Sequence, residues 1–349
     1  MSFPFNVYLL SVVAACLTTL ASLPLWRKWC LRTGLVDDPG ERKIHEAPIP
    51  LAGGLAVMTG LAVPMLIGLI FVWYHTGMKE PGQFSFETGP TTHISIVVEP
   101  MDTQSVGRLE HGFSRRKFEL VGIFLGALGM LIVGVLDDKL ELRPRTKFAG
   151  QLLVAFLVAA SGARITLFVH NVWFSYGITI LWIITLINAF NFMDNMNGLC
   201  AGLGAIGACC FAITAAAGGQ YLVALLAFLT FGALLGFLPY NFPRARAFLG
   251  DAGSHLVGYL LAVLAVLPHF YTSQHPRRWA VLIPLLVLAV PLLDMAWVVI
   301  LRWHRGRPFY QGDTNHLSHR LVRAGLGRVQ AVMVIWLLAG VLGALACLI

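Results

Sequence analysis

The chain has 349 residues, of which 57% are hydrophobic and only 12% are charged, and its mean hydropathy is +0.75. Soluble proteins contain about 25% charged residues, so this composition excludes a soluble domain. The formal net charge of +8 would suggest nucleic-acid binding in a soluble protein. Here we attribute it to lysine and arginine in cytoplasmic loops, and we expect no nucleic-acid partner.

Repeated apolar runs of about 17 to 25 residues predict an all-α, polytopic bundle of membrane-spanning helices. The first run has no basic segment before it and is followed by Arg27, Lys28 and Arg32, which indicates a retained helix rather than a signal peptide. We expect ten spans, at residues 6–26, 51–74, 118–136, 147–161, 176–192, 199–217, 220–238, 253–270, 279–301 and 329–348.

The loops between these spans differ in charge. With the N-terminus outside, the inner loops together with Lys147 carry 17 of the 25 lysines and arginines, which supports this orientation by the positive-inside rule. Most of the acidic residues share these loops. We expect one domain over residues 1–349, with an extracytoplasmic insert at about 75–117 that forms a hairpin or irregular cap, with ISIVV as a strand. The inner loops are residues 27–50, 137–146, 193–198, 239–252 and 302–328.

The first inner loop, GLVDDPGERKIHEAPIPLAGG, gathers Arg42, Lys43 and His45. These cations either bind a ligand or only set topology and contact lipid headgroups. The second loop begins with Asp137 and Asp138, directly after an apolar run. Adjacent carboxylates raise each other's pKa, so Mg²⁺, a basic residue or a catalytic proton transfer would account for them; alternatively, they only end a span. Several basic residues come after this pair, and their positive charge is suited to binding a ligand that carries phosphate.

The stretch NAFNFMDNMNG ends the fifth apolar run and places polar residues at steps of three. At this spacing they cover one broad face of a helix. They form either a polar pocket at the membrane surface or a helix end with side-chain caps. The four residues are Asn188, Asn191, Asp194 and Asn197.

Two more polar stretches follow. In FLGDAGSHLVGYLLA, Asp251 lies between two glycines, where it could approach a metal closely or merely start a helix that Ser254 caps. In RWHRGRPFYQGDTNHLSHRL, His316 and His319 are expected to share one helical face. A zinc site is weakly supported, a phosphate clamp with arginines fits better, and a basic topology loop is the alternative. The arginines of this clamp are Arg305, Arg307 and Arg320. Asp294, deep in the ninth span, is either functional or a buried polar contact.

Carboxylates, amides and many cations on one membrane face suit phosphoryl transfer, which must hold two anionic reactants together. The chain also resembles the polyprenyl-phosphate N-acetylhexosamine-1-phosphate transferases, glycosyltransferase family 4, from about Gly34 to the last span. Five motifs carry the resemblance, in order: RKIHEAPIPLAGG, LDD, NAFNFMDNMNGL, GDAGS and D-x-x-H-x-x-H from Asp313.

The resemblance implies roles for individual residues. Asp251 would be the principal Mg²⁺ ligand, with Mn²⁺ as an alternative metal, and Asp194 an acid at the nucleotide and metal site. Asp137 and Asp138 would lie near the lipid phosphate, to deprotonate it or to help bind metal. The substrate-binding residues expected are Asn188, Asn191, Asn197, Lys43, His45, His316, His319 and Arg307.

The resemblance further implies transfer of a sugar 1-phosphate from a UDP-sugar to undecaprenyl phosphate, at the cytoplasmic face of the inner membrane, with release of UMP. The basic first loop favours an N-acetylglucosamine donor. Alternatives are an N-acetylmuramoyl-pentapeptide donor, a carrier without chemistry, and an inactive family member. Partners would be the two substrates and membrane lipids, and a homodimer is left open.

The sequence departs from the family pattern at three positions. Asn197 stands where the family usually has Asp, Asn195 where it has Gly, and Ser318 where it has His. Asn197 keeps hydrogen bonding but loses a charge, and Ser318 removes one cation from the phosphate region. Because Asp251 and the Asp137–Asp138 pair are intact, we expect the activity to survive, and these departures leave only the identity of the substrate open.

Overall fold

The computed structural model describes residues 4–39, 47–77, 82–87, 93–98, 103–166, 169, 171–268, 278–308 and 313–349. Helices dominate these ranges, as predicted, and each predicted span overlaps one or more of them. The main helices are α1 (Phe5–Thr33), α2 (Gly53–Gly77), α3 (Thr103–Leu140), α4 (Pro144–Ser161), α5 (Val172–Met193), α6 (Leu199–Ala217), α7 (Tyr221–Asn241), α8 (Gly250–Val266), α10 (Ala289–His304) and α12 (Arg328–Leu348).

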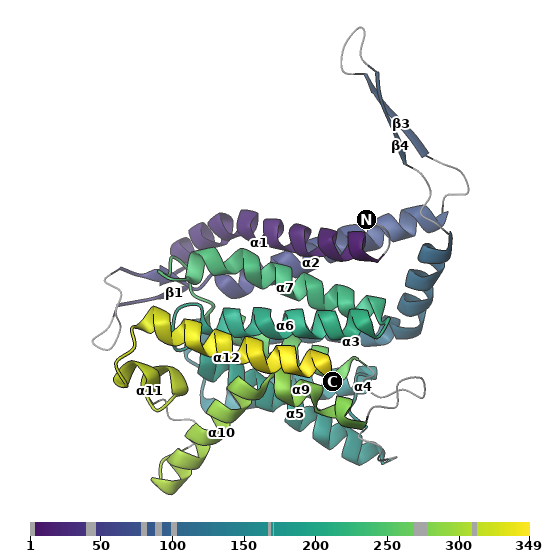
Figure 1. The fold of residues 1–349 in the computed structure, drawn as a ribbon. Coiled ribbons are helices and arrows are strands. Elements are labelled where there is room, and N and C mark those ends of the chain that lie inside the picture. Colours follow the sequence, from purple (N-terminus) through teal and green to yellow (C-terminus); the bar gives the residue numbers. More distant parts are fainter. Residues whose placement is uncertain are drawn as a thin grey trace.

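The helices form a bundle in which α1, α7, α6 and α12 run side by side (Figure 1). Helix α8 packs against α3 and α5 and is buried along most of its length. Helix α6 is rich in alanine, glycine and cysteine, and small side chains let membrane helices approach closely. These two helices therefore form the core around which the others pack.

Seven of the described helices are long and apolar enough to cross a membrane, or eight if one bent pair is a single span. At 17 residues, α8 is shorter than these candidates. A polytopic helical membrane protein is thus confirmed, whereas the count of ten spans and the outside N-terminus remain predictions.

The ninth predicted span is broken. The 3₁₀ helix η1 (Arg278–Leu282) and helix α9 (Ile283–Val287) precede α10, and the chain bends by 70° between α9 and α10. Pro291 lies in the first turn of α10 and has no N–H to donate to the carbonyl of Val287. A continuous helix would need that hydrogen bond, so the break falls where the sequence cannot supply it.

The predicted insert at 75–117 is partly helical, because α2 continues to Gly77 and α3 already begins at Thr103. Between them, β3 (Gly82–Glu87) and β4 (His93–Val98) pair as an antiparallel hairpin, and β4 contains the ISIVV strand that we predicted. The hairpin lies outside the bundle (Figure 1).

The predicted inner loops meet at one end of the bundle, opposite the two termini (Figure 1). Strand β1 (Val36–Asp37) pairs with β2 (Ile49–Pro50), and the Phe248 N–H donates to the Pro50 carbonyl. The short helix α11 (Leu317–Arg323) lies at the same end. The polar residues of separate loops are therefore brought together, as the single-face prediction requires.

Candidate active site

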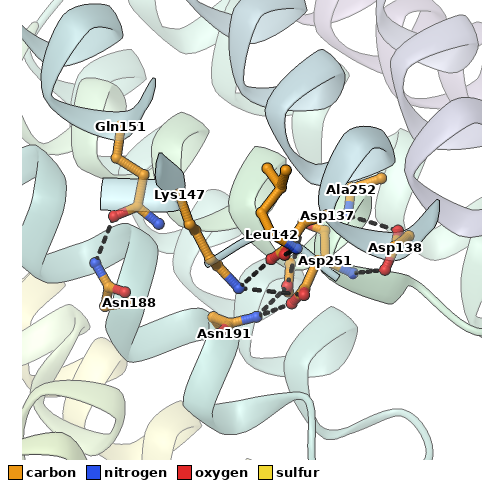
Figure 2. A network of polar contacts seen from close by, with 10 residues as sticks. Asp137, Asp138, Leu142, Lys147, Gln151, Asn188, Asn191, Asp251 and Ala252 are labelled. Atoms are coloured by element: carbon orange, nitrogen blue, oxygen red, sulfur yellow. Dashed lines mark hydrogen bonds and ion pairs between the residues drawn. The ribbon is translucent and has the colours of Figure 1, made fainter. Parts of the chain in front are cut away.

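Two carboxylates and a lysine form the centre of this end of the bundle (Figure 2). Asp137 comes from the last turns of α3, Asp251 from the first turn of α8, and Lys147 from the first turn of α4. The Lys147 ammonium lies 2.6 Å from Asp137 Oδ2 and 3.1 Å from Asp251 Oδ2. Two acids from different helices thus converge on one place where positive charge is held.

Asp138 lies on the other side of Asp251 and holds its backbone. Its two carboxylate oxygens accept the N–H groups of Asp251 (2.7 Å) and Ala252 (3.0 Å), as Figure 2 shows. These N–H groups have no partner inside their own helix, so Asp138 caps α8 from a distant helix. Ser254, which we predicted to cap this helix, instead lies inside it, because α8 begins at Gly250 rather than at residue 253.

Two features of the structure require glycine at position 250. Its φ of +67° is in the left-handed region, and a Cβ there would lie 2.6 Å from Asp138 Oδ2. An added side chain would therefore strain the backbone and push Asp138 away from the N–H groups that it caps. The GDAGS motif thus seats α8 on Asp138 as well as carrying Asp251.

The asparagines of α5 divide between two places. Asn191 donates through Nδ2 to Asp251 Oδ1 and, at 3.0 Å, to Ser254 Oγ, so it belongs to the carboxylate centre (Figure 2). Asn188, one turn earlier, donates to Gln151 Oε1 at 2.8 Å. Asn188 therefore ties α5 to α4 beside the centre, and within the described residues it makes no hydrogen bond with Asp251.

Asp194 follows the last residue of α5 and is the fourth acid of the region, after Asp137, Asp138 and Asp251. Burial, together with the negative charges of Asp251 and Asp138, raises its pKa to about 8. A nearby cation would be needed to keep this carboxyl ionised at neutral pH. Asn197 points elsewhere, because its Nδ2 donates to the Pro243 carbonyl at 3.3 Å.

The histidine motif is organised by Asp294 of α10, a buried carboxylate. Asp294 Oδ2 lies 2.7 Å from His316 Nδ1, and its Oδ1 accepts the N–H of Leu317 at 2.6 Å. His316 therefore precedes α11 rather than sharing a helical face with His319, although the two rings remain neighbours at 6.4 Å. Burial, followed by the charge of His316, lowers the pKa of His319.

Within the described residues, no side-chain contact joins these histidines to the arginines expected to form a clamp with them, so the clamp stays a prediction. Arg320 lies over the Trp297 ring at 5.0 Å, and Arg305 and Arg307 are exposed. A different arginine, Arg302, is buried and pairs with Asp313 at 2.8 Å. Lys43 and His45 lie outside the described residues, so their predicted role in substrate binding is unchanged, as is that of Arg307.

Two of the departures from the family pattern touch each other. Ser318 Oγ donates to Asn195 Oδ1 at 2.6 Å, and Asn195 Nδ2 donates to the Phe192 carbonyl at 2.6 Å. Ser318 is 1% exposed. This pair links the loop that carries Asp194 to the helix that carries His319, and no spacing in the sequence indicated it.

The residues fit a divalent cation. Within the described ranges, oxygen atoms of Asp137 and Asp251 and a ring nitrogen of His255 all lie within 4.8 Å of one another. Carboxylate oxygens are the ligands that Mg²⁺ and Mn²⁺ prefer. Of the two predicted metal ligands, Asp251 belongs to this group and Asp194 does not. The group also contains Asp137, which we predicted as a catalytic residue or as a group that helps to bind metal. His255 was missed, although its place four residues after Asp251 could have indicated it.

The chain is similar to known proteins along most of its length. The family model of glycosyl transferase family 4 matches residues 120–269, which include Asp137, Asp138, Asp194 and Asp251. A probable undecaprenyl-phosphate N-acetylglucosaminyl 1-phosphate transferase of Bacillus subtilis is 30% identical over 334 residues, covering 93% of this chain and 80% of that protein.

Two further relatives cover similar shares. A decaprenyl-phosphate N-acetylglucosaminephosphotransferase of Mycobacterium tuberculosis is 30% identical over 359 residues, covering 95% of this chain and 80% of that protein. An undecaprenyl-phosphate alpha-N-acetylglucosaminyl 1-phosphate transferase of Escherichia coli is 25% identical over 336 residues, covering 92% and 78%. By this similarity along nearly its whole length, the chain belongs to glycosyl transferase family 4.

Proposed function

We propose that this protein transfers N-acetylglucosamine 1-phosphate from UDP-N-acetylglucosamine to undecaprenyl phosphate, with release of UMP. The reaction takes place at the cytoplasmic face of the inner membrane, where the positive-inside rule places the carboxylate centre. The names of the relatives support the lipid acceptor and the sugar. The observation that carries the proposal is the convergence of Asp137, Asp251 and Lys147 from three helices.

The reaction must bring two anions together. An oxygen of the lipid phosphate attacks the sugar-linked phosphorus, a new P–O bond forms, and the P–O bond to UMP breaks. Bound Mg²⁺ would neutralise the diphosphate and stabilise the charge that develops on it. Asp251 and Asp137 would hold this ion, with Asp194 as the predicted additional acid. Lys147 keeps these carboxylates at one place and leaves positive charge beside the reacting phosphates.

The two adjacent aspartates have different parts in this proposal. Asp138 is a positioning residue, because both of its oxygens accept backbone N–H groups of α8. Asp137 faces Lys147 and Asp251, so it is the member of the pair that can accept a proton or bind metal beside the substrates. The neighbouring amides of Asn191 and Asn188 would orient the donor.

The direct test is UMP release by purified protein in detergent with undecaprenyl phosphate and Mg²⁺. UDP-N-acetylglucosamine and UDP-N-acetylmuramoyl-pentapeptide are supplied in parallel, each with an EDTA control. We expect release from the first donor only, and its loss with EDTA. Release from the pentapeptide donor alone would reassign the substrate. Folded protein that releases UMP from neither donor would contradict the assignment and favour a carrier or an inactive homologue.

The Asn195–Ser318 contact gives a second prediction. Asn195→Gly removes the 2.6 Å hydrogen bond, and Ser318→His forces an imidazole ring into a position where the small serine side chain is 1% exposed. We expect each single variant to lower the melting temperature and the rate of UMP release. In the double variant the glycine makes room for the histidine, so a coupling of about 0.5–3 kcal/mol is expected. Thermal unfolding of all four proteins measures it, and strictly additive effects would contradict the pairing.

A further inference from the structure

His255 is a buried polar side chain without a partner. It lies in α8, is 0% exposed, and within the described ranges neither of its ring nitrogens makes a hydrogen bond. Leaving a buried imidazole unpaired costs free energy, because its nitrogens lose the hydrogen bonds that water would make. An apolar residue would fill this place at a lower cost in free energy, so the presence of the imidazole ring needs another explanation.

The surroundings of the ring point to a cation. His255 follows Asp251 by four residues, so the two side chains share one face of α8. One of its ring nitrogens lies within 4.8 Å of oxygens of both Asp137 and Asp251. Asp137 comes from α3 and Asp251 from α8. Lys147, from α4, contacts the same two carboxylates through its ammonium group at 2.6 and 3.1 Å. The lysine marks the place where these acids accept positive charge.

We propose that His255 is a nitrogen ligand of the divalent cation at this centre, and that it shifts the metal preference of the site from Mg²⁺ toward Mn²⁺. The inference rests on the proposed function only for the presence of a cation here. Metal–ligand distances of about 2.0–2.2 Å place any two ligands of one ion within about 4.4 Å. The three donor atoms, within 4.8 Å of one another, need only small side-chain movements to meet this limit.

The preference follows from ligand chemistry. Mg²⁺ is a hard ion that takes oxygen ligands and gives up its water reluctantly. Mn²⁺ and the later divalent metals bind a given nitrogen-containing site increasingly tightly. Two carboxylates alone would serve either ion, so the additional imidazole nitrogen is what separates them.

The test measures metal binding to the purified full-length protein in detergent, without substrates. Free Mn²⁺ is followed by electron paramagnetic resonance, and Mg²⁺ affinity by competition against bound Mn²⁺. We expect His255→Leu to weaken Mn²⁺ binding by about tenfold or more, and Mg²⁺ binding much less. Unchanged Mn²⁺ affinity in this variant, or an equal loss for both metals, would overturn the proposal.

A second readout reports the nitrogen directly. An imidazole bound to Mn²⁺ gives a nitrogen modulation in pulsed electron paramagnetic resonance. We expect this modulation in the wild type and in the control variant His319→Gln, which keeps the whole centre. It should be absent from His255→Gln, which supplies an oxygen instead and serves if the leucine variant does not fold. A modulation that persists in His255→Gln would contradict the assignment.

The two proposals fail in different ways. If UMP release is not observed but Mn²⁺ binding depends on His255, the metal inference stands and the reaction is wrong. If Asp251→Ala binds both metals as tightly as the wild type, the cation lies elsewhere and the inference on His255 is wrong with it.

Discussion

Asp251→Ala is expected to abolish metal-dependent UMP release, the largest effect of any single change in this protein. Asp251 contacts Lys147 and Asn191 through its side chain and belongs to the group of candidate metal ligands. Removing its carboxylate would leave the metal with one fewer oxygen ligand and would leave Lys147 with one carboxylate partner, Asp137, instead of two. The assay is UMP release over a titration of Mg²⁺, on protein shown to be folded by thermal unfolding.

The matched control is Glu141→Gln, which removes an exposed carboxylate from another predicted inner loop, residues 137–146, at the same end of the bundle. It loses the same charge at the same end of the bundle without touching the centre, so its rate should stay close to that of the wild type. Full activity in Asp251→Ala would show that the metal assignment is wrong. An equal loss in both variants would indicate an effect of overall surface charge rather than of a metal site.

Asp138→Asn is expected to lower the rate by about 10²-fold, since a small displacement of a catalytic group can cost this much. Asparagine offers one acceptor oxygen where the carboxylate offers two, and its amide N–H₂ would face a backbone N–H of α8. The first turn of α8, with Asp251, would then shift. Because Asp138 acts through Asp251, the apparent Mg²⁺ affinity should fall together with kcat, while the pH–rate profile keeps its shape.

Asp137→Asn separates this positioning role from acid–base chemistry. If Asp137 accepts a proton during turnover, its loss also costs about 10² or more in rate, but it alters the pH–rate profile. A barely measurable effect of Asp137→Asn would leave that residue as an acid that only ends a span. An altered profile in Asp138→Asn instead would exchange the roles that we propose for the two residues.

The positions of most helices depend on local sequence, and the sequence alone was sufficient to predict them. Helix α6 begins and ends where the apolar run predicted, at residues 199 and 217, and α5 ends beside Asp194 as expected. A membrane-spanning helix satisfies its backbone hydrogen bonds within one segment, so its place depends on that segment's composition. The motifs likewise placed Asp137, Asp138 and Asp251 at one end of the bundle, and the structure brings them together.

The different contacts that those residues make, and hence the different roles that we propose for them, were decided by tertiary structure. Successive residues of a helix point about 100° apart, so Asp137 and Asp138 face different neighbours, and only the packing of α3 on α8 says which. The same holds for His255, whose meaning depends on carboxylates brought in by two helices, and for Ser318, whose partner Asn195 is 123 residues away. Contacts of this kind arise from how helices pack, which no local pattern of residues encodes.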